Sequence, residues 1–289
     1  MLSQSFNPKY FSKLNWNENK KYGATIMCKK NVYWPKFKSY QLKESINDNT
    51  VVVLPVGSCE QHGFHLPLET DATLVYRIAE EAALRAEKQI YILPPIWAGY
   101  SPHHMDFCGS ITLGRETFHH LLFDICKSLM HHGIKHILLL NGHGGNEAIL
   151  KTVVDDLGTK SSIYPILITY FNYFAKQIKE RQRSTEGGMG HAGELETSLQ
   201  LFLSPDFVDK DKLEGEIIPG NKYFKPGMFI NNKIYQYRPF SSYSPIGVLG
   251  EPQAALKETG EELFNLIVDG LAKLFDDIAD GIVQQLQVL

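Results

Sequence analysis

The stretch TVVVLPVGSCEQHGFHLPLETD, residues 50–71, decides the fold. Its first seven residues are apolar or β-branched and end at Gly57, which is typical of a strand buried on both faces of a parallel sheet. Acidic and imidazole side chains follow at once. Because ligands bind beyond the carboxyl ends of the strands of an open parallel sheet, this order predicts a strand that leads into a functional loop.

Outward from this stretch, helical and strand patterns alternate. Apolar residues recur at helical spacing over residues 72–86, with Thr70 or Asp71 as the N-cap. Such alternation is typical of right-handed crossovers between parallel strands, so we expect an α/β fold with a mostly parallel sheet. The further predicted strands are 90–93, 136–141 and 163–168, and the further predicted helices are 115–132, 146–157, 171–181 and 194–203.

The C-terminal part has a different composition. Residues 205–252 are rich in Gly, Pro, Tyr and Phe with weak periodicity, which predicts loops and a hairpin over one edge of the site. One long amphipathic helix is predicted over 251–278. At the other end, residues 1–45 are rich in aromatic residues and lysine. We expect an arm that packs on a neighbouring subunit or folds back on its own domain, followed by a metallohydrolase domain over 46–289.

Composition excludes several classes of protein. The 289 residues carry a formal net charge of −3, and Lys and Arg form no stripe, so nucleic acid and anionic membranes are not expected partners. We find no apolar run long enough for a signal peptide or a membrane span. The four cysteines are scattered without Cys-x-x-Cys spacing, which favours reduced thiols and a cytoplasmic protein.

Three loops carry the residues suited to metal chemistry. Glu60, His62 and Asp71 follow the first strand, and His143 stands among glycines directly after the strand predicted at 136–141. Since both loops leave the same edge of a parallel sheet, their side chains are expected to converge. Imidazole and carboxylate ligands without thiolate suit zinc or manganese, and iron also fits.

The third loop, residues 187–193, is glycine-rich and leads into the helix predicted at 194–203. It carries His191, and Glu194 and Glu196 follow. A carboxylate in the first turn of a helix is favoured by the helix dipole alone, so one of the two glutamates has a purely structural interpretation. The two should point to different faces, and we expect one of them to be functional.

The motifs together resemble the creatininase (creatinine amidohydrolase) family. They are Glu60-Gln61-His62-Gly63 with Asp71 eleven residues after Glu60, Asn141-Gly142-His143-Gly144-Gly145-Asn146, and His191-Ala192-Gly193 before Glu196-Thr197-Ser198. The resemblance implies a three-layer α/β/α domain. It also implies a centre of two divalent ions, zinc ahead of manganese or iron.

The same resemblance implies roles for individual residues. Glu60, His62, Asp71 and His143 match the metal ligands, with Asp71 as the bridge, and His191 matches a histidine that contacts substrate and moves protons. The sequence departs from creatininase itself at Gly145, where that enzyme has a glutamate. The last ligand is therefore open between Glu194 and Glu196, and we choose Glu196, which we also assign to catalysis. In the loop over 97–113, which resembles a loop of the family, the substrate-binding candidates are Ser101 and His104.

The expected function is that of a metal-dependent hydrolase. It would cleave a C–N bond of a small molecule, in an amide, cyclic amide or formamide, by metal-activated water, with His191 protonating the leaving nitrogen. One alternative is a family hydrolase acting on a cyclic keto-polyol. Another is a glycine-loop module for phosphate or nucleotide without hydrolase activity, although Gly142-His-Gly-Gly145 lacks the spacing of known phosphate loops. The resemblance implies a homo-oligomer, with a hexamer as the family's frequent form.

Overall fold

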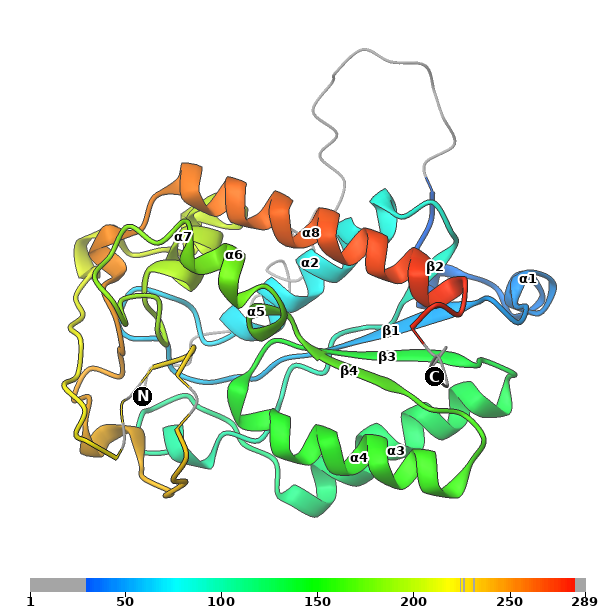
Figure 1. Cartoon of the computed structure of the whole chain (residues 1–289), viewed down its shortest axis with the longest axis horizontal. Helices are drawn as coiled ribbons and strands as arrows, with labels where there is room; N and C mark the ends of the chain where they lie inside the picture. The colour runs from blue at the N-terminus through cyan, green and yellow to red at the C-terminus, as the bar shows by residue number, and fades with distance from the viewer. Residues whose placement is uncertain (1–29, 224, 226, 231, 284–289) are drawn as a thin grey trace, which may run out of the picture. The chain divides into compact units, whose positions relative to one another are not determined.

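Four strands form the sheet at the centre of the structure, a computed structural model that describes residues 30–223, 225, 227–230 and 232–283 (Figure 1). The strand order is β2-β1-β3-β4 and all three pairings are parallel, which confirms the predicted parallel sheet. β4 begins three residues later than predicted, just after Pro165, which cannot donate to a ladder. The strands are β1 (Val51–Val56), β2 (Ile90–Ile92), β3 (His136–Asn141) and β4 (Ile166–Thr169).

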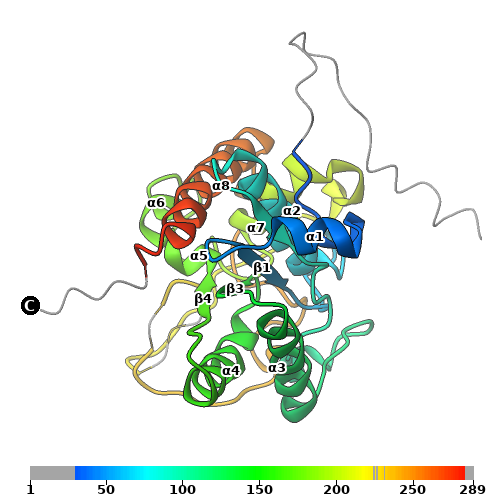
Figure 2. The ribbon, with the colours of Figure 1, turned by 90° about the vertical axis from the view of Figure 1, so that its right-hand side faces the viewer.

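Helices cover both faces of this sheet, so the expected three-layer α/β/α architecture is confirmed (Figures 1 and 2). Alternate residues of β1 serve the two layers, since Val51 and Val53 belong to one apolar core and Val52 and Leu54 to the other. One layer contains α2 (Thr70–Arg85), α5 (Tyr170–Tyr173), α6 (Ala175–Lys179), α7 (Glu194–Leu203) and α8 (Lys257–Ala279), and the other contains α3 (Arg115–His131) and α4 (Glu147–Lys160).

Three further predicted elements differ from the structure. The helix expected over 171–181 is divided into α5 and α6, and the long closing helix begins at Lys257, because Pro252 starts a separate 3-10 turn, η8 (Pro252–Ala254). The hairpin expected within 205–252 is wrong for the residues described there, which form 3-10 turns and loops without a strand. These turns are η5 (Pro205–Phe207), η6 (Lys210–Lys212) and η7 (Phe240–Ser242).

Residues 32–37 of the predicted arm pack against β2. The Ile92 amide donates to the Val32 carbonyl at 2.7 Å, and the rings of Trp34 and Phe37 meet Tyr91 edge-on at centroid distances of 5.4 and 5.1 Å. The segment continues through η2 (Trp34–Lys36) into α1 (Ser39–Ser45). The aromatic residues of the predicted arm near positions 16 and 22 lie outside the described residues.

The ends of β1 and β3 place the site. Val56 and Asn141, the last residues of these strands, are partners in the parallel ladder, so the two loops that follow leave the sheet side by side. The Asn146 side chain, in the loop after β3, donates to the Gly57 carbonyl in the loop after β1 at 2.9 Å. It also accepts from the Tyr100 amide, in the loop after β2, at 2.8 Å, so it holds the three loops together. Within the described part of the chain, none of the helices combines the length and apolar character that crossing a bilayer requires.

Candidate metal centre

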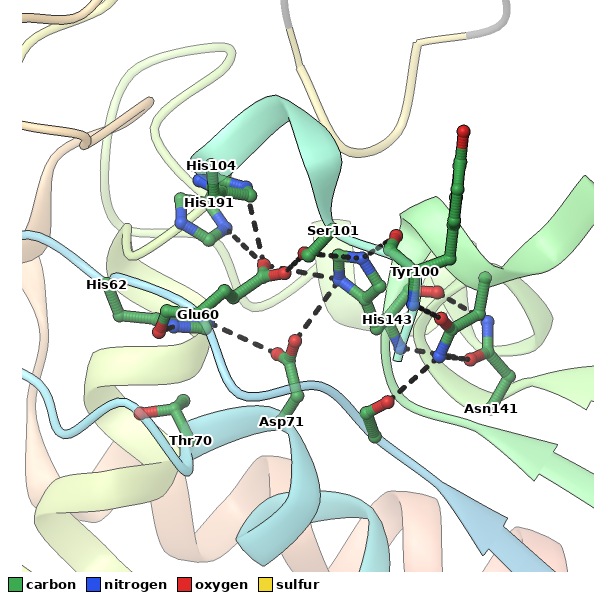
Figure 3. Close-up of polar contacts among 12 residues, drawn as sticks. Glu60, His62, Thr70, Asp71, Tyr100, Ser101, His104, Asn141, His143 and His191 are labelled. Carbon is green, nitrogen blue, oxygen red and sulfur yellow. Dashed lines mark hydrogen bonds and ion pairs between the residues drawn. The ribbon is translucent and has the colours of Figure 1, made fainter. Parts of the chain in front are cut away.

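Buried carboxylates and imidazoles from four segments meet at this edge of the sheet; Glu60, His62, Asp71 and His143 are drawn in Figure 3. Glu60 and His62 lie in the loop after β1, Asp71 in the first turn of α2, His143 directly after β3 and Glu196 in the first turn of α7. All five side chains are buried, with exposed fractions of 5% or less. The structure therefore brings together the five residues that the sequence suggested as ligands.

One group of potential ligands consists of Glu60, Asp71 and His143. The Nδ1 atom of His143 lies 3.2 Å from Glu60 Oε1 and 3.2 Å from Asp71 Oδ2. These two carboxylate oxygens are fully buried and lack a partner with hydrogen-bond geometry. Because a buried, unpaired anionic oxygen is costly, this arrangement fits a cation held between them.

A second group consists of His62, Asp71 and Glu196. The Nε2 atom of His62 lies 3.2 Å from Asp71 Oδ1 and 3.8 Å from Glu196 Oε2. The Nδ1 atom of His62 lies 3.0 Å from the Glu60 carbonyl, to which it donates, so Nε2 faces the carboxylates as a free acceptor whenever the ring is neutral. Asp71 belongs to both groups and offers one oxygen to each.

Mutual charge determines the protonation of the cluster. Burial alone would raise the pKa of Glu60, but the facing His143 and His104 hold it well below its usual value. Burial raises the pKa of Glu196 to about 7. Burial opposes charge on His62 as well, yet the charge and hydrogen bond of Asp71 raise its pKa to about 10. Without a bound cation, the imidazolium of His62 therefore neutralises part of the carboxylate charge.

His191 and His104 lie on the other side of Glu60. The Nδ1 atom of His191 is 3.7 Å from Glu60 Oε1, and the Nε2 atom of His104 is 3.4 Å from the same oxygen. Burial lowers the pKa of His191 to about 3 and also lowers that of His104, so both rings are neutral near pH 7. Neutral imidazoles have one donor and one acceptor nitrogen, and their neighbours decide which is which.

Gln61 is the neighbour that fixes both rings. His191 Nε2 lies 2.8 Å from the Gln61 carbonyl and donates to it, which leaves Nδ1 as the acceptor facing Glu60. The Gln61 side-chain amide donates to His104 Nδ1 at 2.8 Å and to the Gly247 carbonyl at 2.9 Å. His104 therefore presents an N–H from Nε2 to Glu60. The sequence motif contained Gln61, but only its contacts show this positioning role.

Ser101 and His104 stand around the 3-10 turn η3 (Pro102–His104) and both reach Glu60. Ser101 Oγ donates to Glu60 Oε2 and lies 3.2 Å from His143 Nε2. The backbone carbonyl of Tyr100 also lies 3.2 Å from His143 Nε2. His103, the neighbour of His104 in this turn, stacks on His143 with centroids 5.7 Å apart.

The two glutamates of α7 have different surroundings. Glu194 accepts backbone hydrogen bonds from Arg183 at 3.0 Å and Ser184 at 2.8 Å, and it belongs to neither ligand group. Glu196 accepts from the Ala192 amide at 2.6 Å and faces His62. The expectation that the two point to different faces is therefore confirmed by these contacts. His65, also in the first loop, pairs with Thr197 at 3.0 Å and lies outside the groups.

A cavity of about 340 Å³ opens beside the cluster. This volume is at the small end of the range for ligand sites in proteins. Glu60, Asp71, His143, His191 and Glu196 all border it, and Phe240 adds an aromatic wall. Buried carboxylates next to neutral imidazoles and an accessible pocket form an arrangement suited to metal-assisted hydrolysis.

Comparison with known proteins agrees with this arrangement. The sequence model of the creatininase family, described as creatinine amidohydrolase, matches residues 33–275. A 3-dehydro-scyllo-inosose hydrolase of Thermotoga maritima is 30% identical over 265 residues, which cover 86% of this chain and 84% of that protein. A mycofactocin precursor peptide peptidase of Mycolicibacterium smegmatis is 30% identical over 230 residues, covering 77% and 83%.

The fold also superposes on a solved structure described as "Creatininase Mn" with a TM-score of 0.74, at 24% identity, covering 86% of this chain and 98% of that one. Fold, buried cluster and relatives together define a metal-dependent hydrolase. The chain belongs to the creatininase family.

Proposed function

We propose that the centre holds two divalent ions bridged by Asp71 and that the enzyme hydrolyses a C–N bond of a small molecule. The observation that carries this proposal is the position of the Asp71 carboxylate, whose Oδ1 faces His62 and whose Oδ2 faces His143, each at 3.2 Å. Glu60 would complete one site and Glu196 the other. Two sites that share one carboxylate are the arrangement needed for a pair of ions.

The donor set favours zinc or manganese. Each site would have one imidazole nitrogen and carboxylate oxygens, and thiolate is absent from both ligand groups. The match to a manganese creatininase supports manganese through its fold alone. Iron remains the third candidate from donor chemistry.

Ions held here would acidify a water molecule and polarise a carbonyl oxygen, which allows hydrolysis at neutral pH. The chain's own residues would then move the proton. His191 is neutral, its Nε2 is occupied by the Gln61 carbonyl, and its Nδ1 faces Glu60 across the cavity. We assign His191 Nδ1 to accept a proton and to deliver it to the departing nitrogen. Glu196 would act in catalysis as a ligand. Ser101 and His104 hold Glu60, and His104 also borders the cavity for the substrate.

The C–N bond is favoured over the alternatives by what the relatives act on. The family description names an amidohydrolase, and one relative is a peptide peptidase, so two of the three activities break amide-type bonds. The inosose hydrolase keeps a cyclic keto-polyol as the second candidate. A phosphate module is disfavoured, because His143 of the glycine loop lies 3.2 Å from two buried carboxylates that would repel a phosphate.

The metal content of the purified protein tests whether the centre binds two ions. Purified protein loaded with zinc or manganese should contain about two ions per chain, and Asp71→Ala should lose both because both sites use this carboxylate. Glu69→Gln is the matched control, since this exposed acid lies two residues earlier and outside both ligand groups. A folded wild-type protein that binds no ion, or Asp71→Ala with undiminished content, would contradict the dinuclear centre.

A panel of substrates tests whether the enzyme hydrolyses a C–N bond. Formamides, cyclic amides and dipeptides are to be compared with a cyclic keto-polyol such as an inosose, using the metal-loaded enzyme and its Asp71→Ala variant. Metal-dependent amine release supports C–N hydrolysis. Turnover of the keto-polyol alone would replace it with the second candidate.

We further propose a cytoplasmic homo-oligomer, for which a hexamer is the first arrangement to test. Its support is the family resemblance together with apolar side chains exposed near the site, such as Phe64 at 60%, Trp97 at 55% and Met105 at 50%. Light scattering of the full chain distinguishes a hexamer from a monomer.

A further inference from the structure

A second, larger cavity lies next to the metal centre. Its volume is about 830 Å³, against about 340 Å³ for the cavity at the carboxylate cluster. The two share His103, Gly144, Gly145 and Tyr243 as a common border. The scissile bond needs to lie beside the carboxylate cluster in the smaller cavity, so the larger one is available to another part of the same molecule.

At Gly144, none of the side chains that the structure describes separates the two cavities. A Cβ atom built on Gly144 would meet no heavy atom within 4 Å, so the space above this residue is open. At Gly145, a Cβ would instead meet His143 Nε2 at 2.4 Å and the Tyr100 carbonyl at 2.6 Å. Gly144 therefore offers a side-chain-free stretch of backbone over which an extended ligand can pass from one cavity to the other.

The larger cavity has positive charge that the protein leaves without an acidic partner. Arg115 donates from Nε to the Tyr100 hydroxyl at 2.9 Å, and Arg238 donates to the side-chain oxygen of Gln236 at 3.0 and 3.1 Å. Among the described residues, neither guanidinium forms an ion pair with a carboxylate. Glu116 is the one acidic residue on the lining, so positive charge exceeds negative there. Guanidinium groups bind carboxylate and phosphate oxygens through paired N–H donors.

Tyrosine rings supply the remaining walls. Tyr100 carries the Arg115 guanidinium above its ring at 5.5 Å from the centroid, while Tyr235 and Tyr237 are 90% and 55% exposed. The Tyr237 hydroxyl donates to the Pro102 carbonyl at 3.3 Å, which holds this loop over η3. Exposed aromatic faces around an apolar floor are suited to stacking against a flat ring.

Tyr100 connects the two cavities. Its backbone carbonyl lies 3.2 Å from His143 Nε2, whereas its ring points away from the Glu60 cluster (Figure 3). The hydroxyl at the far end of the ring accepts from Arg115 Nε at 2.9 Å. One residue, Tyr100, thus spans the space between His143 and the Arg115 guanidinium. A substrate of comparable length can reach both.

We propose that the larger cavity binds a ring that carries an anionic group, carboxylate or phosphate, at the end of the substrate remote from the scissile bond. Arg115 and Arg238 bind the anion, the tyrosines pack on the ring, and the bond to be cleaved lies beside Asp71. This inference rests on the proposed C–N hydrolysis and specifies its substrate class as ring-bearing anionic amides.

Three formamides test this inference on the metal-loaded full chain: 4-formamidobenzoate, 4-formamidophenyl phosphate and the uncharged formanilide. Amine release gives kcat/KM for each. We expect at least one anionic formamide to exceed formanilide by about tenfold or more, because paired guanidinium contacts form only with the anion. The ranking of the carboxylate and phosphate compounds then identifies the anion.

The double variant Arg115→Gln/Arg238→Gln should lower this advantage to less than about threefold, mainly through KM, because the anion contacts are made at a distance from the reacting atoms. Arg77→Gln is the matched control, since it removes an exposed arginine from α2, away from the cavity. Equal kcat/KM for the three formamides, or an advantage that survives in the double variant, would overturn the inference while leaving C–N hydrolysis intact.

Binding separates failure of the inference from failure of the proposed function. If none of the formamides is hydrolysed, binding of 4-aminobenzoate and 4-aminophenyl phosphate is measured by saturation-transfer NMR, with aniline as the neutral reference. Binding of an anion that the double variant loses supports the cavity assignment even if the bond cleaved is different. Binding of neither anion, or binding equal to that of aniline, refutes it.

Discussion

Glu194 and Glu196 stand two residues apart in the first turn of α7, yet their carboxylates serve different parts of the structure. Glu194 accepts from the backbone amides of Arg183 and Ser184, whereas Glu196 lies 3.8 Å from His62 Nε2. Both are almost completely buried. In this one helix turn, Glu194 therefore holds the preceding loop by hydrogen bonds, and Glu196 is a proposed metal ligand on the other side.

Substitution of Glu194 should affect stability, whereas the same substitution of Glu196 should affect metal binding. Glu194→Gln should lower the free energy of unfolding by about 1–3 kcal/mol, because charge-assisted hydrogen bonds to two amides are weakened, and metal content should stay near that of wild type. Glu196→Gln should lower metal content towards one ion per chain, because Glu196 belongs only to the proposed site with His62 and Asp71. Denaturant titration and elemental analysis measure the two effects. Loss of metal in Glu194→Gln with retention in Glu196→Gln would reverse the assignment.

Sequence patterns predicted the sheet and the loops that carry the ligands, but only in part which glutamate of α7 faces the other ligands. The apolar run at Val51–Val56 and the acid and imidazole residues after it were readable because strand burial and metal chemistry each require particular residue types. The choice between Glu194 and Glu196 was only partly readable, since both occupy the dipole-favoured first turn. It depends on which side of α7 faces His62, and that follows from packing against α8 and α2.

Gln61 and the larger cavity lay beyond sequence reasoning for a similar reason. An amide side chain has no chemistry of its own that marks a site, and Gln61 gains its role from Gly247, 186 residues away in the chain. The hairpin expected within 205–252 was wrong because Gly, Pro and aromatic residues favour turns and strand edges alike. Tyr235–Arg238 instead forms a wall, which only the tertiary structure shows.

At Gly145, where the resemblance implies a glutamate in creatininase itself, a side chain would not fit without displacing its neighbours. A Cβ there would come within 2.4 Å of His143 Nε2 and 2.9 Å of His103. Gly145→Ala should therefore displace His143 and weaken metal binding by about tenfold or more, as disturbed ligand orientation does elsewhere. Gly144→Ala is the matched control, because its Cβ meets nothing within 4 Å. Titration with a competing chelator measures both, and equal affinities would show that His143 can move without cost.

Gln61 predicts a loss of turnover without a loss of metal. In Gln61→Leu, His104 Nδ1 and the Gly247 carbonyl lose their donor, so His104 is no longer held with its N–H towards Glu60. We expect kcat to fall by about ten- to a hundredfold, with near-normal metal content.

Gln61→Glu distinguishes hydrogen bonding from packing. The two side chains have nearly the same shape, but an ionised carboxylate accepts hydrogen bonds and cannot donate one to His104 or Gly247. The Glu variant should be as impaired as the Leu variant at neutral pH. Full activity of Gln61→Glu would mean that side-chain volume alone matters at this position.

The buried histidines predict that the metal-free protein is most stable near pH 6.5. His62 has its pKa raised to about 10 in the folded state, so its contribution is complete below the unfolded value of about 6.5 and is lost as pH rises towards 10. Burial lowers the pKa of His191 to about 3 and that of His103 to about 4. These two rings stay neutral in the folded state, so stability is lost as pH falls below about 6.5 and the unfolded chain takes up protons.

Denaturant titrations of chelator-treated protein at pH 4.5, 6.5 and 9 measure this dependence. From pH 6.5 to 9 we expect the free energy of unfolding to fall by about 2–3 kcal/mol through His62 alone, and His62→Gln should reduce the decline by this amount. The rest of the decline comes from His143, whose pKa Glu60 and Asp71 also raise despite burial. Metal-loaded wild type should lack the part of the decline that His62 causes, because an ion bound at His62 Nε2 requires the neutral ring and releases its proton. A decline of equal size in metal-free wild type and His62→Gln would show that another group causes it and that the charge on His62 is not held by Asp71.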